Sequence, residues 1–359
     1  MQVRPAKLRN PIKCSQASEL QMSLVPDFEA IPAFEQQSWQ QQMSAAWRSA
    51  PDLLIRLGIP PESTAVGTSD FPLLAPESFV RRMQPGTLED PLLKQILPVD
   101  LEEQATDGFV ADPVGDLASR RVPGLLQKYE GRALLIATGA CAVHCRYCFR
   151  RNYPYRTEPR TLKDWQPALS AIRMDDSLTE VIFSGGDPLM LSDRRLQELF
   201  TAVDDIPHVE RIRLHTRLPI VLPARVTSEF INTISQLRTQ VVVVVHANHP
   251  TEIQADCVDA LRILTLSPAT VLNQAVLLRG INDSTDTQAE LCRRLVNLGV
   301  LPYYLHQLDR VSGAAHFETP LSRGQQIVRE LRTILPGYAV PRFVQELQGK
   351  PGKTIMESL

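Results

Sequence analysis

Apolar and polar positions follow two different rhythms along the second part of the chain. From residue 132 onward, short apolar runs such as 241–245 precede longer stretches in which apolar residues recur every three or four positions. The short β-branched runs are typical of strands buried on both faces of a parallel sheet, and the longer rhythm is typical of amphipathic helices. The pattern predicts six strands, at residues 133–138, 180–184, 211–216, 241–247, 271–278 and 302–307. It predicts six helices, at residues 162–174, 194–205, 228–237, 253–266, 287–298 and 322–335.

Six strand–helix units in series predict an α/β fold with a parallel sheet that is wound in one direction. The pattern alone leaves open whether this sheet closes into a barrel. In both cases the ligand site lies at the carboxyl ends of the strands. Residues that directly follow a strand are therefore the first candidates for chemistry.

The first 122 residues have a different character. Residues 1–36 contain Pro and Gln without a clear period, and we expect them to be poorly ordered or variable. Residues 37–122 are predicted to form a helical segment and a looser linker, because Trp39, Met43 and Trp47 recur at roughly helical spacing. Residues 123–359 form the predicted strand–helix domain, which ends in a short C-terminal segment.

Composition and charge exclude several classes of protein. With 43% hydrophobic and 22% charged residues, the chain is typical of a globular protein rather than a disordered one. Its net charge of −2 gives no electrostatic reason to expect a nucleic acid or a membrane surface as partner. The apolar runs are too short to span a bilayer, and no apolar stretch follows the basic N-terminus as a secretory signal requires. We therefore expect a cytoplasmic protein.

Three of the six cysteines are close together in the sequence. Cys141, Cys145 and Cys148 directly follow the first predicted strand with C-x3-C-x2-C spacing. Three thiolates can bind three corners of a [4Fe–4S] cluster and leave the fourth iron open to a ligand. A structural zinc site and an electron-transfer cluster are the alternatives, although both normally take four protein ligands. The other cysteines are interpreted as buried or incidental thiols: Cys14, Cys257 and Cys292.

A glycine-rich segment follows the second predicted strand. It reads Ser184-Gly185-Gly186-Asp187-Pro-Leu, and glycines allow a backbone to approach a ligand closely. Together with the three-cysteine motif, this segment resembles the radical S-adenosylmethionine (SAM) enzymes, in which it holds the methionine part of SAM. The resemblance implies a partial (β/α)6 TIM-like barrel of the radical SAM type, preceded here by the N-terminal helical segment.

Further blocks at the ends of the later strands narrow this resemblance. In chain order they include His215-Thr-Arg217, His246-Ala-Asn248-His249, Asn273-Gln274 and Pro302-Tyr-Tyr-Leu-His-Gln-Leu-Asp309. In this order they resemble the lysine 2,3-aminomutase family from about residue 123 to residue 353. The resemblance implies an isomerase that converts L-α-lysine to β-lysine. The N-terminal segment, with Asp90-Pro-Leu-Leu-Lys-Gln95, most resembles the family branch that serves β-lysylation of elongation factor P.

The family uses pyridoxal 5′-phosphate (PLP) as well as SAM, so the resemblance implies a lysine that holds PLP covalently. The chain has only seven lysines, and Lys353 in Glu346-Leu-Gln-Gly-Lys350-Pro-Gly-Lys353 matches the family position. Lys350 is the alternative. Without the resemblance, a lysine this close to the C-terminus is expected to be a solvated surface residue.

Phosphate and substrate contacts follow from the same resemblance. Arg132 and Arg217 match the arginines that bind the PLP phosphate, and Arg150 matches the arginine that binds the substrate carboxylate. Asp309 matches a carboxylate that binds the ε-ammonium group of lysine. Glu346 occupies the position of the second such carboxylate, where the family has aspartate, so reach or stereochemistry can differ. The further basic position before the first strand is held by Lys128, where an arginine is common in the family.

The remaining SAM contacts are expected at Tyr147, whose ring can lie against adenine, and at Gln274 and His246. Each of them has an ordinary structural interpretation as well. The resemblance also implies an electron donor such as flavodoxin or ferredoxin.

Two rival functions stay open at this point. One keeps the machinery but changes the substrate to glutamate or another amino acid, which two carboxylates near the substrate disfavour. The other is a non-catalytic iron–sulfur or zinc module. The sequence leaves undetermined the product stereochemistry, the physiological reductant, the oligomeric state and the use of the product by elongation factor P.

Overall fold

The computed structural model describes residues 37–67 and 71–357, and Ser38–Leu359 form one compact unit that is separate from Met1–Gln37. The expectations for residues 1–36 and for Cys14 lie outside the described residues. The domain boundary at 122/123 stays a prediction.

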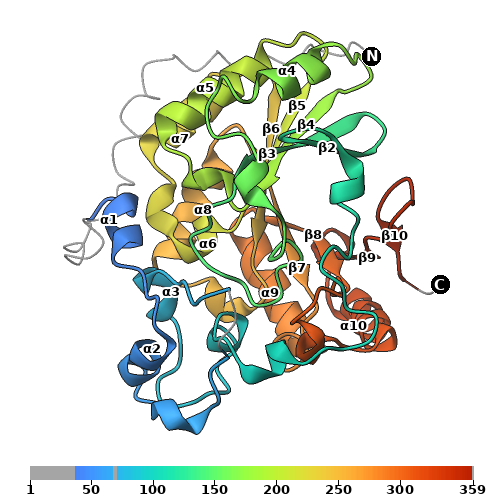
Figure 1. Ribbon diagram of the computed structural model, residues 1–359. Helices are drawn as coiled ribbons and strands as arrows, with labels where there is room; N and C mark the ends of the chain where they lie inside the picture. Colours follow the sequence, from blue (N-terminus) through green and yellow to red (C-terminus); the bar gives the residue numbers. More distant parts are fainter. Residues whose placement is uncertain (1–36, 68–70, 358–359) are drawn as a thin grey trace, which may run out of the picture. The chain divides into compact units, whose positions relative to one another are not determined.

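A single ten-stranded sheet forms the centre of the compact unit, and its strands lie in sequence order from β1 to β10 (Figure 1). Strands β3 to β9 are parallel, whereas β1, β2 and β10 pair antiparallel at the two ends. The strands are β1 (Arg120–Val122), β2 (Leu125–Tyr129), β3 (Arg132–Thr138), β4 (Glu180–Gly185), β5 (Arg211–Thr216), β6 (Gln240–His246), β7 (Thr270–Val276), β8 (Leu301–His306), β9 (Arg342–Gln345) and β10 (Thr354–Ile355).

Helices connect the parallel strands and cover the outer face of the sheet (Figure 1). Serine and threonine residues begin several of them; Thr227 caps α7 and Ser284 caps α9 through their side-chain oxygens. The helices are α1 (Trp39–Ser44), α2 (Ala50–Arg56), α3 (Glu77–Val80), α4 (Gln166–Arg173), α5 (Asp193–Asp204), α6 (Leu218–Val221), α7 (Ser228–Ser235), α8 (Asp256–Leu266), α9 (Thr285–Asn297) and α10 (Leu321–Ile334).

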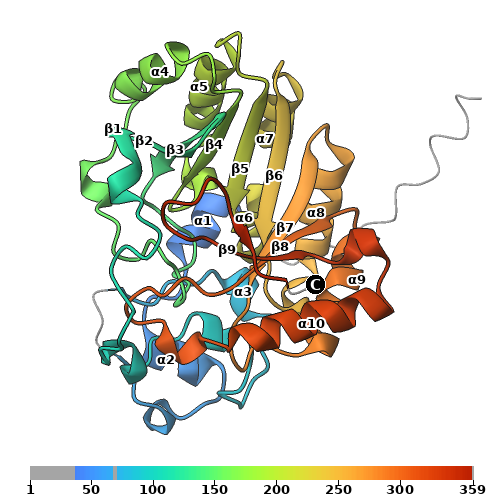
Figure 2. The same cartoon turned by 90° about the vertical axis from the view of Figure 1, so that its right-hand side faces the viewer.

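The six predicted strands correspond to β3 to β8, and the six predicted helices correspond to α4, α5 and α7 to α10. The fold is therefore the predicted α/β architecture, and its serial strand order leaves the described sheet open, as in a partial barrel. Four short strands were not predicted. Two of them, β9 and β10, bring the C-terminal segment in front of the sheet, where Figure 2 draws it in red.

The N-terminal segment has less helix than its spacing predicts. Between residues 38 and 97 the chain forms α1, α2 and α3, separated by turns. Prolines interrupt this stretch repeatedly and remove the backbone donors that a longer helix needs. The segment still packs firmly, because Leu53, Phe79 and Leu93 are fully buried in the same hydrophobic cluster as the strands β3 to β7.

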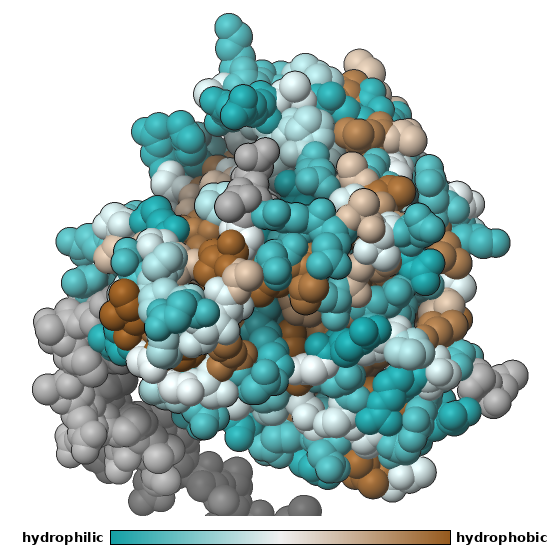
Figure 3. Space-filling view, turned by 60° about the horizontal axis from the view of Figure 1, so that its bottom comes forward, coloured by the Kyte–Doolittle hydropathy of each residue, from teal (hydrophilic) through white to brown (hydrophobic). Residues whose placement is uncertain are grey.

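No helix among the described residues is long and apolar enough to cross a membrane. Hydrophilic residues predominate on the face shown in Figure 3, and the hydrophobic areas on this face are small and scattered. Scattered apolar residues of this kind are normal on a protein surface.

Candidate active site

The three clustered cysteines lie on the loop that follows β3, at the carboxyl end of the sheet. Cys141, Cys145 and Cys148 are all free and partly buried. Burial is the main cause and the neighbouring Cys145 the next one that raise the pKa of Cys148 to about 11. The pKa of Cys141 is also raised, first by burial and then by the neighbouring Cys148. Because neighbouring cysteines contribute to both shifts, the three thiols lie close together.

The three thiols do not form a single-ion site as they stand. Among the described residues, no three His, Cys, Asp or Glu side chains surround one metal-ion position. A cubane cluster binds each thiolate to a different iron, so its ligands must be farther apart than those of one ion. Three cysteines on one loop, without a fourth, fit a cluster that keeps one iron open.

The glycine-rich segment packs directly on the cysteine loop. Gly185 has a φ of +122°, and a Cβ at this position would lie 2.5 Å from the carbonyl oxygen of Thr138. A Cβ at Gly186 would lie 2.4 Å from the carbonyl oxygen of Ala140. Both positions therefore require glycine for packing of the two loops, whether or not a ligand approaches them.

Asp187 is buried and holds neighbouring loops together. Its carboxylate accepts hydrogen bonds from the Thr216 hydroxyl and the Arg217 backbone N–H, each at 2.7 Å, and from the Leu189 backbone N–H at 3.1 Å. Burial raises the pKa of Asp187 to about 6, although these hydrogen bonds oppose the shift. The structure thus gives Asp187 a positioning role; its predicted contact with SAM stays a prediction.

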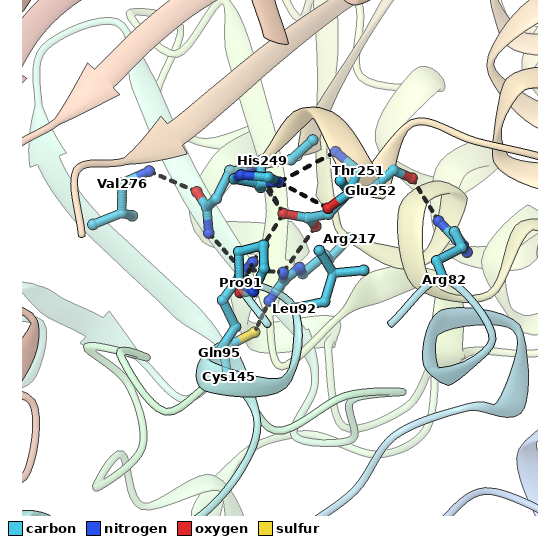
Figure 4. Close-up of polar contacts among 12 residues, drawn as sticks. Arg82, Pro91, Leu92, Gln95, Cys145, Arg217, His249, Thr251, Glu252 and Val276 are labelled. Atoms are coloured by element: carbon cyan, nitrogen blue, oxygen red, sulfur yellow. Dashed lines mark hydrogen bonds and ion pairs between the residues drawn. The ribbon is translucent and has the colours of Figure 1, made fainter. Parts of the chain in front are cut away.

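Arg217 lies at the centre of a buried polar network beside the cysteine loop (Figure 4). Its Nη1 atom donates to Cys145 Sγ at 2.7 Å, and its Nη2 atom donates to Gln95 Oε1 at 2.6 Å and to Glu252 Oε2 at 3.0 Å. Both terminal nitrogens are therefore occupied by protein groups. The guanidinium is directed toward the cysteine loop, and its predicted contact with the PLP phosphate stays a prediction.

Tyr147 belongs to the same network. Its hydroxyl donates to Gln95 Oε1 at 3.3 Å and accepts from Asn248 Nδ2 at 2.6 Å. The Arg217 guanidinium lies 5.6 Å from the centre of the Tyr147 ring. The hydroxyl is fixed by protein contacts, and the predicted stacking of the ring on adenine is not tested by them.

The C-terminal segment places Lys353 within a chain of charges. Lys353 Nζ donates to Glu346 Oε2 at 2.7 Å, and Lys128 Nζ contacts Glu346 Oε1 at 3.0 Å and Asp116 Oδ1 at 2.7 Å. Asp116 in turn accepts from Arg150 Nε at 2.6 Å. Lys353 is thus ion-paired and partly buried, because β10 pairs with β9 on the sheet. Lys350 is exposed.

The electrostatics of this chain differ from one carboxylate to the next. Burial alone would raise the pKa of Glu346, but Lys353 and Lys128 outweigh it and lower that pKa to about 2. For Asp116, burial would likewise raise the pKa, but Arg150 and Lys128 outweigh burial and lower it. Asp309 is different: burial raises its pKa to about 7, and Lys353 only partly counteracts this. Asp309 is therefore the carboxylate without a close ionic partner among the described residues, and a bound cation would complete it.

Arg150 also contacts the glycine-rich segment. Its Nη1 atom donates to the Ser184 hydroxyl at 2.9 Å, while its Nε atom is held by Asp116. Ser184, predicted to contact SAM, here fixes the arginine that was predicted to bind the substrate carboxylate. Because Asp116 holds the Nε atom and Ser184 holds the Nη1 atom, the guanidinium has a defined orientation.

Three histidines at strand ends have an Nε2 atom that is buried without a hydrogen-bond partner: His215, His246 and His306. Burial lowers the pKa of His246 to about 3 and lowers those of His215 and His306 as well. Neutral imidazoles with unused nitrogen atoms are costly in a protein interior. The three imidazoles fit a site in which a polar ligand forms hydrogen bonds with these nitrogen atoms. His246 is adjacent to Gln274 in the parallel register of β6 and β7, as expected for two residues that share one ligand.

Arg132 is the first residue of β3, whereas the cysteine loop follows the last. Its guanidinium lies 4.6 Å from the centre of the Tyr129 ring. Burial raises the pKa of Tyr129, and Glu346 is the next cause, so Arg132 lies on the side of the site where Lys353 and Glu346 meet.

A cleft of about 580 Å³ is lined by residues that include Asp309, Glu346, Gln307, Gln345, Arg310 and Glu318. Its volume is in the range of small-molecule sites. Two of the carboxylates that the sequence pairs with an ammonium group thus border the same cleft.

Three functional candidates were missed by the sequence: Asp116, Gln95 and Glu252. Asp116 falls in the predicted linker, where nothing marks it before its contacts with Arg150 and Lys128 are known. Gln95 was named only as the end of the Asp90–Gln95 block, and its complete burial was not expected. Glu252 follows the His246–His249 block closely, which was the one available signal.

The amino-acid sequence of the chain is similar to those of several L-lysine 2,3-aminomutases. The chain is 42% identical over 325 residues to the L-lysine 2,3-aminomutase of Escherichia coli, covering 89% of this chain and 95% of the relative. It is 41% identical over 324 residues to the L-lysine 2,3-aminomutase of Haemophilus influenzae, covering 89% and 96%. The L-lysine 2,3-aminomutase of Clostridium subterminale is 36% identical over 277 residues, covering 77% of this chain and 66% of the relative.

No protein-family model matches the chain. Among solved structures, a radical SAM methyltransferase from Sphaerobacter thermophilus is similar with a TM-score of 0.44 and 19% identity, covering 61% of this chain and 68% of that one.

Proposed function

Because this chain belongs to the L-lysine 2,3-aminomutase family, we propose that it is a radical SAM, PLP-dependent isomerase that moves the amino group of L-lysine from C2 to C3 and yields β-lysine. The observation that carries this proposal is the identity of 41–42% over 89% of the chain to two L-lysine 2,3-aminomutases. The ion pairs that link Lys353 through Glu346, Lys128 and Asp116 to Arg150 support it, because they join an amine, carboxylates and a guanidinium in one region.

Cys141, Cys145 and Cys148 would hold the cluster, and Ser184 to Asp187, His246, Gln274 and Tyr147 would contact SAM. Lys353 would hold PLP, with Arg132 near its phosphate. When bound, the cluster and SAM supply a radical that removes hydrogen from the substrate, and PLP carries the migrating amine. The unpartnered imidazole nitrogen of His246 supports a polar ligand at this place. Lys353 reaches the site because the β9–β10 pair turns the C-terminal segment back onto the sheet.

Substrate orientation follows from opposite charges at the two ends of the site. Arg150 binds the carboxylate of lysine, and its guanidinium keeps one orientation because Asp116 and Ser184 hold it. Asp309 and Glu346 bind the ε-ammonium group. A pKa of about 7 for Asp309 indicates that a cation there is needed to keep it ionised. Glutamate would bring a carboxylate to this end and meet like charge, which supports lysine as substrate.

Three finer proposals concern the surroundings of the enzyme. We propose that the electron comes from a one-electron carrier such as flavodoxin or ferredoxin, and that the reaction takes place in the cytoplasm. We further propose that β-lysine serves the modification of elongation factor P. The chain is more similar to the Escherichia coli and Haemophilus influenzae relatives, at 42% and 41% identity, than to the clostridial one, at 36%, which supports a place in their branch of the family.

An anaerobic assay tests the proposed function. The protein is reconstituted with iron, sulfide and PLP, then given SAM and dithionite together with L-lysine, L-glutamate, L-arginine or L-ornithine in separate reactions. Chromatography with mass detection should find β-lysine and no other β-amino acid. Cleavage of SAM without β-lysine would retain the radical chemistry and reject the substrate. An intact cluster without cleavage of SAM would reject the proposed enzyme class.

The link to elongation factor P has its own test. Expression of this chain in an Escherichia coli strain that lacks its L-lysine 2,3-aminomutase should restore the β-lysyl mass addition on elongation factor P. A Cys145→Ser variant serves as the inactive control. Restoration of β-lysine in the cells without modified elongation factor P would contradict this part of the proposal.

A further inference from the structure

The buried network around Arg217 has no role in the proposed chemistry so far. It joins three distant parts of the chain: Gln95 from the N-terminal segment, Cys145 from the cysteine loop, and Glu252 from the turn after β6 (Figure 4). Gln95 and Glu252 are fully buried, and Arg217 is 5% exposed. A buried charge pair of this kind is an expensive structural element, which calls for a function beyond stability.

The network fixes the position of the Arg217 guanidinium closely. Gln95 Nε2 donates to Glu252 Oε1 at 3.1 Å, and the backbone N–H groups of Asn248 and His249 donate to the same oxygen at 2.9 and 3.0 Å. The guanidinium also lies between two rings, 5.5 Å from the centre of Phe79 and 5.6 Å from that of Tyr147. Gln95 and Glu252 both hold the Nη2 atom, and with this end of the planar group fixed, the Nη1 atom is directed toward the Cys145 sulfur.

Hydrogen bonds to cysteine sulfurs and local net charge are two of the factors that set the reduction potential of an iron–sulfur cluster. A donated hydrogen bond and a positive charge favour the reduced cluster, which carries one more electron. Glu252 is the opposing element, because its negative charge next to Arg217 offsets part of this effect. An arginine suits the position better than a lysine, since a single planar group reaches the sulfur, the amide and the carboxylate together.

We propose that Arg217, held by Gln95 and Glu252, is a positioning residue that donates a hydrogen bond to the Cys145 sulfur and raises the reduction potential of the cluster. The inference rests on the proposed function, because it requires the cluster. It gives the Asp90–Gln95 block a function: the side chain of Gln95 holds Arg217, and its backbone oxygen accepts from the Arg146 N–H on the cysteine loop at 2.9 Å.

The test is an EPR-monitored redox titration of the reconstituted protein without SAM or PLP. Arg217→Gln should shift the potential to more negative values, because the hydrogen bond and the charge are lost and Glu252 is left unpaired. Glu252→Gln should shift it to more positive values, because the offsetting charge is lost. Arg217→Lys should give a smaller negative shift. A purely structural role would not produce shifts of opposite sign.

Arg225→Gln is the matched control. Arg225 is another fully buried arginine that pairs with Asp193 and donates to the Leu189 carbonyl oxygen, without a contact to a cysteine. The Arg225→Gln variant should be less stable, and the reduction potential of its cluster should equal that of the wild type. PLP affinity should be unchanged in Arg217→Gln, whereas an arginine that binds the phosphate would lose it.

The outcomes separate the inference from the proposed function. A wild-type protein that binds no cluster rejects the proposed function. A wild-type cluster whose potential is unchanged in Arg217→Gln rejects the inference alone. If Arg217→Gln does not retain its cluster, Glu252→Gln decides, and an unchanged or more negative potential in that variant overturns the inference.

Discussion

Two regions of the site treat charge differently. Around Cys145, the carboxylate of Glu252 and the terminal nitrogens of Arg217 have protein partners at hydrogen-bond distance. Around Lys353, the Nε2 atoms of the buried His215 and His306 have no partner in the described part of the chain, and burial raises the pKa of Asp309 to about 7. In the first region the charged groups are paired with one another, although the Arg217 Nε atom has no partner among the described residues, whereas the second region has buried imidazole nitrogens that a polar ligand could satisfy.

The difference indicates how the two regions serve the reaction. A cluster must sit in fixed surroundings, because a change in hydrogen bonding alters its reduction potential. A substrate site must release its product, so part of its stabilisation has to come from the ligand itself. Variants on the Lys353 side should therefore change binding and turnover while they leave the cluster intact.

The largest effect is expected for Lys353→Ala. Loss of the amine that holds PLP should lower β-lysine formation on the order of 10⁴-fold or more. Borohydride treatment followed by mass spectrometry should detect PLP attached to the wild-type protein and none on the variant. Iron and sulfide content should equal that of the wild type, which would confirm that the two regions are independent.

Lys350→Ala is the matched control for this prediction, because Lys350 is exposed and lies three positions away in the same segment. It should keep PLP and most of the activity. If instead Lys350→Ala loses PLP and Lys353→Ala keeps it, the two lysines have to exchange roles.

A smaller effect is expected at Asp309, and it depends on pH. Since burial raises the pKa of Asp309 to about 7, the ionised form that binds an ammonium group is lost as the pH falls through 7. The value of kcat/KM for lysine should fall by about tenfold per pH unit well below pH 7. In kcat this limb should move to lower pH, because the bound ammonium favours the ionised carboxylate.

Asp309→Asn checks this assignment. It should remove the acid limb and lower kcat/KM at pH 8 by roughly 10- to 100-fold, the value of a charge-assisted hydrogen bond. Steady-state kinetics between pH 5.5 and 9 measure both effects. An acid limb that persists in the variant would assign the titration to another group.

The smallest effect is expected for Glu346→Asp, which restores the residue that the family has at this position. The shorter side chain cannot keep its contacts with both Lys128 and Lys353, which now lie at 3.0 and 2.7 Å. The KM for lysine should rise about three- to tenfold. A decrease in kcat/KM of more than a hundredfold would mean that the contacts of Glu346 with Lys128 and Lys353 are both required. The Lys353 region would then depend on fixed protein contacts as strongly as the Cys145 region does.

The strands that could be predicted are those with a strong pattern of their own. Residues 241–245 are five valines in sequence, and β6 forms there because a strand buried on both faces requires such a run. The strands β1, β9 and β10 have two to four residues, several of them charged or exposed. They exist because neighbouring strands offer hydrogen bonds, which no local pattern indicates.

The same limit applies to the site. Cysteine spacing and the Gly185-Gly186 pair are local signals, and the structure brings their two loops together. The roles of Asp116 and Gln95 arise only from contacts across more than thirty positions of the chain, with Arg150 and Arg217 respectively. Arg217 shows the limit most clearly, since its hydrogen bond to Cys145 depends on the fold and has no signal in the sequence.

The place of Lys353 in the chain also orders events during synthesis. A nascent chain leaves the ribosome N-terminal end first, so β3 to β8 and the cysteine loop emerge before β9 and β10. The cluster ligands are therefore available to iron while the lysine that would hold PLP is still being synthesised. Attachment of PLP to this lysine therefore requires that β9 and β10 have already been synthesised.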